Sequence, residues 1–121
     1  MSHHVLEAGT DATGEAREHV RNDLGTTLPA GKVADAQLMT SELVANAVQH
    51  ASLEAGATIG LDITVAAGSI NISVVDAGAG FAHEEGDRDF GGWGLVIVEH
   101  LSDRWGIRQG HPHSVWFEID R

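Results

Sequence analysis

The sequence predicts an α+β fold: a two-layer α/β sandwich in which helices cover one face of a mainly antiparallel mixed sheet. Two observations lead to this prediction. Segments in which apolar and polar residues alternate, as in strands, occur in pairs that can form hairpins. Segments with the apolar spacing of helices occur in blocks before and between these pairs. Such an order favours helices packed on one side of a sheet over repeated βαβ units. With 121 residues the chain can bury one core, so we expect residues 1–121 to form a single domain.

Three helices are expected. The first covers residues 11–24, where apolar residues recur every four positions and Gly25 ends the helix. The second covers residues 33–52, follows a loop at Pro29, and contains neither glycine nor proline. Its apolar side is predicted to hold Leu38, Val44, Ala45 and Val48. The third helix, residues 93–102, is too apolar to be exposed and should pack on the sheet.

Five strands complete the prediction. Residues 3–8 could form a short edge strand, and residues 57–67 and 69–77 alternate as two strands of a hairpin closed at residues 67–69. Residues 103–109 and 114–120 form the last hairpin, with a turn through Gly110 and Pro112. Between the two hairpins, residues 77–92 form a glycine-rich, acidic loop that precedes the third helix.

Composition excludes several classes of protein. With 7 Lys and Arg against 18 Asp and Glu, the net charge is −11, which repels nucleic-acid backbones. That charge would suit a basic protein partner, or it could simply keep the protein in solution. The absence of cysteine excludes disulfides and Cys-ligated zinc. No segment resembles a signal peptide or a membrane span, so we expect a cytoplasmic location and no contact with membranes.

Histidines and tryptophans outside the motifs are given structural interpretations. The pairs His3–His4 and His111–His113 are expected to be surface residues rather than zinc ligands. Trp105 and Trp116 lie on predicted strands and are expected in the core rather than as a base-stacking platform.

The second helix carries a polar ridge. Glu42, Asn46 and His50 follow one another at steps of four residues, each of which rotates only about 40° around a helix. A carboxylate and an amide oxygen one turn apart suit Mg²⁺ chemistry: the amide can ligate the cation and the carboxylate can accept a proton. An ordinary solvated helix face has the same spacing, so this ridge alone does not distinguish a Mg²⁺ site from an exposed surface.

Two glycine motifs follow. Asp76 ends an apolar strand and precedes Gly78 and Gly80, so its carboxylate could accept a hydrogen bond from an exocyclic amine while the glycines admit a flat ring. Further on, Gly92 and Gly94 open the third helix just before Leu95, where free backbone amides could bind phosphate. Neither motif is a Walker A loop or a Rossmann turn, and either could be an ordinary loop.

The order of the three motifs resembles a known family. Helical ExxxN, strand-end DxGxG and helix-opening GxGL are similar to the N, G1 and G2 boxes of the Bergerat-fold (GHKL, histidine-kinase-like) ATPases, and the resemblance covers about residues 10–120. Within that superfamily the segments SELVANAVQHA, LVIVEHLSDRWG and SVWFEID look like the bacterial anti-sigma-factor serine/threonine kinases and their actinobacterial relatives.

This resemblance implies a role for each motif residue. Glu42 would be the general base, Asn46 would coordinate the Mg²⁺ that accompanies ATP, and Asp76 would read the adenine amino group. The remaining residues implied to bind nucleotide are Gly78, Gly80, Gly92, Gly94 and Leu95, with Ser114 supporting Asp76 through its hydroxyl. Residues 77–92 would form the ATP lid.

Three departures from the family pattern stand out. The sequence GHPHS replaces a Gly-Lys-Thr-like turn, which removes a basic contact with the ligand. The lid is acidic, and Arg88 is its only candidate cation for the γ-phosphate. We expect no attached dimerisation or phosphoacceptor domain, so His50 is not interpreted as a phosphorylated histidine.

Two functions from different classes are therefore expected. One is a kinase that uses Mg-ATP to phosphorylate a Ser or Thr of a STAS-type anti-sigma-factor antagonist. The other is a non-catalytic module that binds a sigma factor or another regulator and is tuned by nucleotide. A homodimer is possible in either case, and a nucleotide-free relic that uses its sheet for binding is a third, weaker alternative.

Overall fold

The computed structural model describes residues 1–51, 57–76, 92–108 and 113–121, and only the backbone at residues 50, 51, 76, 92–94 and 113. In these ranges the chain forms β1 (Ser2–Glu7), α1 (Ala12–Leu24), α2 (Ala30–Ala51), β2 (Thr58–Val65), β3 (Ser69–Asp76), α3 (Gly92–Leu101), β4 (Arg104–Arg108) and β5 (His113–Asp120). Every expected helix and strand is present.

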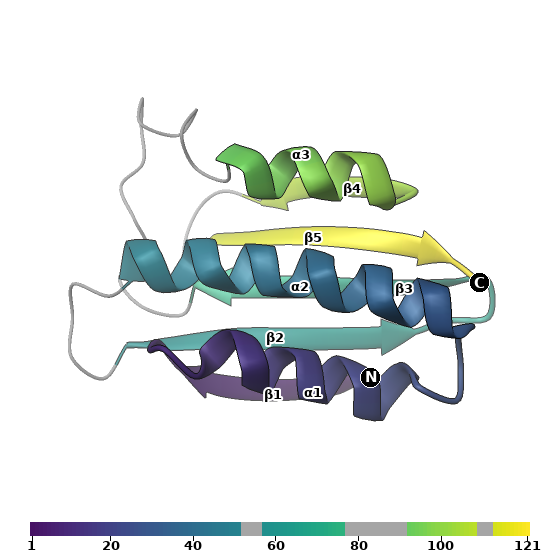
Figure 1. Ribbon diagram of the computed structural model, residues 1–121, viewed down its shortest axis with the longest axis horizontal. Coiled ribbons are helices and arrows are strands. Elements are labelled where there is room, and N and C mark those ends of the chain that lie inside the picture. The colour runs from purple at the N-terminus through teal and green to yellow at the C-terminus, as the bar shows by residue number, and fades with distance from the viewer. Residues whose placement is uncertain (52–56, 77–91, 109–112) are drawn as a thin grey trace.

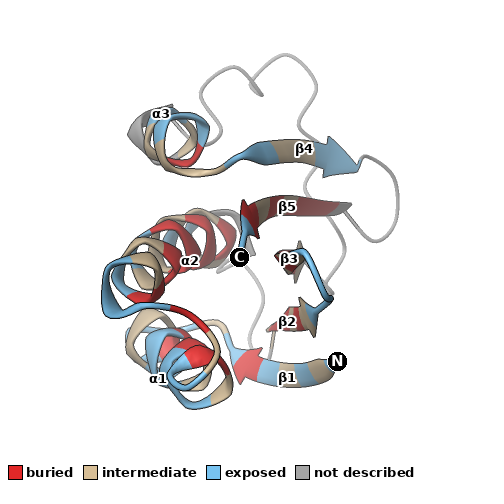
Figure 2. Ribbon diagram, turned by 90° about the vertical axis from the view of Figure 1, so that its right-hand side faces the viewer, coloured by how far each residue is buried: buried red, intermediate tan, exposed pale blue. Residues whose placement is uncertain are grey.

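The strands form one sheet in the order β1-β2-β3-β5-β4, and α1, α2 and α3 lie on one face of it (Figures 1 and 2). The two-layer α+β sandwich is therefore confirmed, with β1 at one edge as predicted. All four pairings are antiparallel among the described strands, so the parallel component of the expected mixed sheet is absent from them. Hairpins make β2–β3 and β4–β5 antiparallel neighbours, and β5 returns beside β3.

Helix α2 packs along the middle of the sheet with a face that includes the predicted Val44 but neither Leu38 nor Ala45. Leu38 is 43% exposed and Ala45 is also exposed, so both lie on the outer side, while Val48 is only partly buried. The buried side consists of Val33, Ala36, Met39, Thr40, Leu43, Val44 and Ala47. These positions recur every three or four residues, which is the spacing of one helical face. The prediction was wrong for Leu38 because it lies half a turn from Ala36 and Thr40.

The start of α2 also differs from the prediction. The helix begins at Ala30, three residues earlier than expected, because Pro29 stands just outside it. The Pro29 carbonyl accepts hydrogen bonds from the backbone N–H groups of Lys32 and Val33, both at 3.0 Å. Proline is compatible with this position since the first N–H groups of a helix have no partner inside it. The predicted loop at Pro29 is thus the start signal of the helix.

The core lies between the helices and the sheet. Every second residue is buried from Ile59 to Ile63 in β2, from Ile70 to Val74 in β3 and from Val115 to Ile119 in β5, and Phe117 is the largest side chain that is fully enclosed among the described residues. Val98 of α3 is buried while Val96 is 40% exposed, so α3 packs on the core through one face. Trp105 packs against the core as expected.

Trp116 departs from the expected core position. It lies between the buried Val115 and Phe117 of β5, so strand alternation puts it on the sheet face without helices. Its indole lies over Gly106, where an added Cβ would come within 2.9 Å of the ring nitrogen. The guanidinium of Arg108 lies 6.0 Å from the Trp116 ring centroid.

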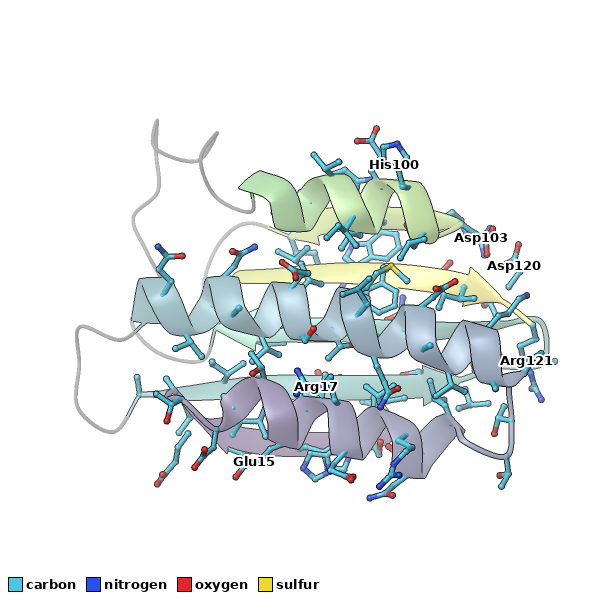
Figure 3. The ribbon with its side chains drawn as sticks, in the orientation of Figure 1. Glu15, Arg17, His100, Asp103, Asp120 and Arg121 are labelled. Carbon is cyan, nitrogen blue, oxygen red and sulfur yellow. The ribbon has the colours of Figure 1, made fainter. Side chains whose placement is uncertain are left out.

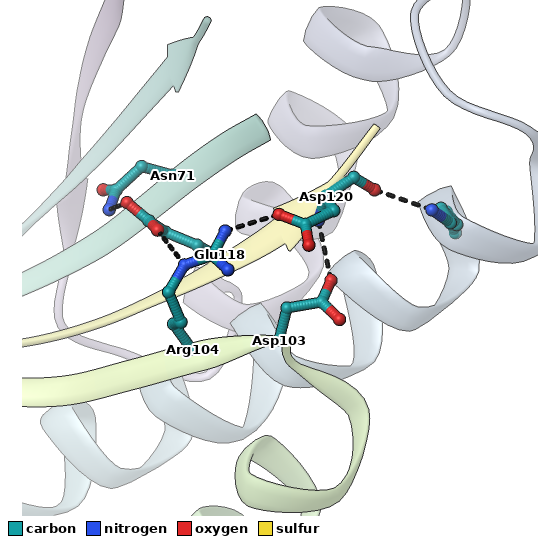
Figure 4. Close-up of polar contacts among 6 residues, drawn as sticks. Asn71, Asp103, Arg104, Glu118 and Asp120 are labelled. Atoms are coloured by element: carbon teal, nitrogen blue, oxygen red, sulfur yellow. Dashed lines mark hydrogen bonds and ion pairs between the residues drawn. The ribbon is translucent and has the colours of Figure 1, made fainter. Parts of the chain in front are cut away.

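A polar network fixes the carboxyl end of β5 (Figure 4). Arg104 donates from Nε to Glu118 at 2.7 Å and from Nη2 to Asp120, and Asn71 donates to Glu118 at 3.1 Å. Lys32 at the start of α2 donates to the Asp120 carbonyl at 2.6 Å. The network joins β3, β4, β5 and α2, and Asp103 and Asp120 lie together at this end of the molecule (Figure 3).

This network predicts an acid-dependent contribution to stability. Hydrogen bonds from Arg104 hold the pKa of Glu118 and the pKa of Asp120 below their ordinary values. A carboxyl with a lowered folded-state pKa stabilises the fold above its unfolded pKa, and this contribution is lost as pH falls through the folded pKa. We expect the melting temperature of wild type to exceed that of Arg104→Gln at neutral pH, and the two curves to converge on acidification from about pH 5 to about pH 3.

The matched control for this experiment is Arg17→Gln, which alters an exposed arginine on α1. Its melting temperature should follow the wild-type curve across the same pH range. A constant difference between wild type and Arg104→Gln from neutral pH down to about pH 3 would contradict the network's role.

Candidate functional site

The ends of four elements gather at one end of the molecule. The carboxyl ends of α2 and β3 and the amino ends of α3 and β5 all lie at the left of Figure 1. The Arg104 network lies at the opposite end. The topology therefore brings together the three motif segments, although they are separated by up to half the chain.

On α2 the polar ridge survives at the margin of the buried face. Glu42 and Asn46 are partly buried, and they are flanked by the buried residues Leu43, Val44 and Ala47. Within the described ranges, no hydrogen bond or ion pair engages either side chain. His50 continues the ridge in the backbone, but its side chain lies outside the described part.

The amide of Asn46 is the outstanding feature of this ridge. Its Nδ2 is buried and has no hydrogen-bond partner among the described residues. Buried polar groups are almost always paired, so this donor is available to a partner from outside the described residues, such as a ligand. Thr40 Oγ1 is also buried without a hydrogen-bond partner among the described residues, but Thr40 belongs to the core-facing side of α2. A hydrated cation with its phosphate ligand fits Asn46, because the amide offers one oxygen acceptor and two donors.

The second motif ends β3. Asp76 is the last residue of the strand and pairs with Ile59 of β2 on one side and His113 of β5 on the other. Ser114, the predicted support for Asp76, is buried but pairs with Val75. In the backbone register His113 is therefore the residue of β5 directly opposite Asp76.

The sequence prediction did not place His113 opposite Asp76. His113 was considered only as a member of a surface histidine pair. The position of His113 follows from the register in which β3 pairs with β5, and the sequence alone does not give that register. Gly78, Gly80 and Arg88 lie outside the described residues, and so does the acidic segment of residues 77–91.

The third motif forms the beginning of α3. Gly92 and Gly94 are in its first turn, and Leu95 is partly buried and packs against the core. No acidic residue occupies that first turn. A helix start free of carboxylates keeps its positive dipole end available to an anion. The first backbone amides of α3 therefore lie at the end of the molecule where α2 ends.

The histidine pair near the N-terminus has protein partners. His3 pairs with Asp62, and His4 lies 3.2 Å from Asp23 and stacks on His19. The described part of the chain contains no group of three or more His, Asp or Glu side chains suited to a metal ion. Of the helices in that part, none combines the length and apolarity required to cross a bilayer.

A half-buried carboxylate–amide pair, a strand-end aspartate and a glycine-containing helix start lie at one end of the molecule, an arrangement that suits a phosphorylated ligand with a cation. Comparison with known families agrees with it. A family profile described as the histidine kinase-like ATPase domain matches residues 6–117, so the chain belongs to that family. The family assignment carries ATP binding and the GHKL fold with it. No curated protein matches the sequence significantly.

Replacement of the unpaired Asn46 amide is predicted to lower ATP affinity without lowering the stability of the fold. Asn46→Ala removes an unpaired buried donor and introduces a better helix former, so we expect the free energy of unfolding without ligand to stay level or rise by about 0.5 kcal/mol. Mg-ATP affinity, measured by calorimetry, should fall at least about tenfold because the amide contact is lost.

Asn22→Ala is the matched control, since Asn22 is an exposed asparagine within α1. It should change stability in the same direction and leave ATP affinity unaltered. Wild-type ATP affinity in Asn46→Ala would show that the orphan amide does not face the ligand.

Proposed function

We propose that this domain is a Mg-ATP-dependent protein kinase that phosphorylates a Ser or Thr of a small partner protein. The observation that carries the proposal is Glu42: a partly buried carboxylate without a partner in the described chain, one helical turn from the orphan amide of Asn46. A carboxylate in this state is free to accept a proton from an incoming hydroxyl.

Each residue has a defined part in the proposed transfer. The partner's hydroxyl oxygen attacks the γ-phosphorus of ATP, the bond from that phosphorus to the β–γ bridging oxygen breaks, and ADP leaves. Glu42 accepts the hydroxyl proton, while Asp76 holds the adenine amine and Asn46 contributes an oxygen ligand to Mg²⁺. Bound Mg²⁺ supplies charge neutralisation on the phosphates. Phosphoryl transfer needs mainly such positioning and charge compensation from the protein.

The proposed acceptor is a STAS-type anti-sigma-factor antagonist. This choice rests on the resemblance of the α2, α3 and β5 segments to anti-sigma-factor kinases. The acidic balance of the chain, −11 overall, argues for a partner with a basic docking surface and against nucleic acid. We also propose that this chain works in the cytoplasm.

Glu42→Gln tests the chemical step. With labelled ATP and candidate antagonists, wild type should transfer phosphate and Glu42→Gln should be at least about 100-fold slower, because the amide cannot accept the proton. ATP affinity should change less than about threefold, since the carboxylate is assigned no role in holding nucleotide. Glu15→Gln, an exposed glutamate on α1, should behave as wild type.

Transfer that is undiminished in Glu42→Gln would overturn the kinase proposal. A second function, a nucleotide-tuned binding module, is favoured by the acidic balance alone. That function would be supported by a partner that binds wild type and Asn46→Ala equally without ATP and is never phosphorylated.

A further inference from the structure

The outer side of the helical layer carries exposed apolar residues. The middle turns of α2 expose Ala34, Leu38 and Ala45, none of which is charged. On α3, Val96 stands two residues, about 200° around the helix, from the buried Val98 and therefore faces away from the core. Leu38 is 43% exposed and Val96 is 40% exposed. Because the solvent side of a surface helix is normally polar, these two large side chains indicate an interaction surface.

The two helices that carry these residues pack side by side on the sheet and run antiparallel (Figures 1 and 2). Leu38 stands two turns before Asn46, which is about 12 Å along the helix, and Val96 stands one turn after Gly92, about 6 Å. Both side chains therefore lie beside the ligand end without belonging to the nucleotide motifs. We call this surface the α2–α3 patch, and its members are Ala34, Leu38, Ala45 and Val96.

The position of Glu42 indicates what covers the patch. Glu42 stands one turn after Leu38, and Cβ atoms four residues apart in a helix are about 5–6 Å from each other. Under the proposed kinase function, on which this inference rests, the acceptor hydroxyl must come within about 3 Å of the Glu42 carboxylate. A protein–protein interface covers about 800 Å² of each partner, an area roughly 30 Å across. A folded acceptor that reaches Glu42 therefore also covers Leu38.

Carboxylates border the patch. Asp35 and Glu42 stand three residues before and four residues after Leu38, and Glu99 is exposed on α3. Among the described residues, none of the three carboxylates forms an ion pair. Lys32 is the only Lys or Arg in either helix, and its Nζ donates to a backbone carbonyl of β5 at the opposite end of the molecule. A partner with an apolar centre and a basic rim is complementary to this surface.

We propose that the α2–α3 patch is the docking surface for the protein that receives the phosphoryl group. The acceptor presents an apolar area to Leu38 and Val96, and lysine or arginine side chains to the carboxylates around them. Apolar contact at the centre contributes affinity, and the complementary charges set the orientation that brings the acceptor hydroxyl to Glu42. Since the patch lies beside the nucleotide motifs, substitutions in it should separate acceptor binding from ATP binding.

The test measures the affinity of the full chain for a panel of STAS-domain proteins by calorimetry. A non-hydrolysable ATP analogue and Mg²⁺ are present, so that the bound partner is not consumed. Wild type should bind at least one member of the panel. Leu38→Lys and Val96→Lys each remove apolar contact and place a cation against the basic rim of that partner, so each should weaken its binding at least about tenfold.

Val65→Lys is the matched control. Val65 is 41% exposed, and it ends β2 opposite Ile70, at the end of the sheet away from Asp76. This variant should bind the partner as wild type does. All three variants should keep the circular dichroism spectrum and the affinity of wild type for the ATP analogue, because the substituted side chains are exposed and lie outside the nucleotide site.

Two results would overturn the docking inference: a partner that binds Leu38→Lys and Val96→Lys as tightly as wild type, or a panel in which wild type binds no member. If these substitutions only abolish contact between copies of this chain and leave partner binding intact, the inference fails in the same way. Failure of the kinase proposal has a different signature. A partner that binds through the patch but receives no phosphate from labelled ATP would overturn the kinase and retain the patch as a docking surface.

Discussion

The packing of α2 across the sheet is the constraint on which the rest of this structure depends. One face of the helix, from Val33 to Ala47, must be buried against β2, β3 and β5. A helix has a single phase, so burying these residues fixes the direction of every other side chain on it. Glu42 and Asn46 are thereby held at the margin, between core and surface, and the Asn46 amide nitrogen is enclosed without a partner among the described residues.

An enclosed donor without a partner costs free energy, of the order of 1–3 kcal/mol for a neutral group. The fold bears this cost at the end of the molecule where β3 ends and α3 begins. The opposite end is joined by Arg104, Glu118, Asp120 and Lys32 across four elements. The described contacts of Arg104 thus lie at the end of the molecule opposite Glu42 and Asn46, which we propose are available to ATP and to an acceptor hydroxyl.

Much of the fold could be predicted from the sequence because its strands alternate cleanly. Ile59, Leu61 and Ile63 are buried at every second position, and the hairpin between β2 and β3 closes at the predicted turn, where Ala66 N–H donates to Ser69 O. The phase of α2 could not be predicted reliably. Its small apolar residues occupy all sides, so periodicity did not distinguish the exposed Ala45 from the buried Ala47.

The motif residues of the candidate site could be proposed from the sequence, but the residues that lie beside them in the sheet could not. Glu42, Asn46 and Asp76 were found from motif spacing, which depends only on local structure. The position of His113 opposite Asp76 depends on the register of β3 with β5, two strands separated by α3 and β4. The register between strands that are distant in the sequence is set by packing of the whole sheet, so a short motif cannot predict it.

The central claim is that this domain binds ATP through Asp76 and the adenine amine. Calorimetric titration of Mg-ATP into wild type and Asp76→Asn tests it most directly, with inosine triphosphate, which lacks that amine, as the matched ligand. We predict that wild type binds ATP and that either the substitution or the change of base weakens binding about 10-fold to 100-fold, as expected for loss of a hydrogen bond to a charged group. Equal affinity of wild type and Asp76→Asn for ATP would contradict the account.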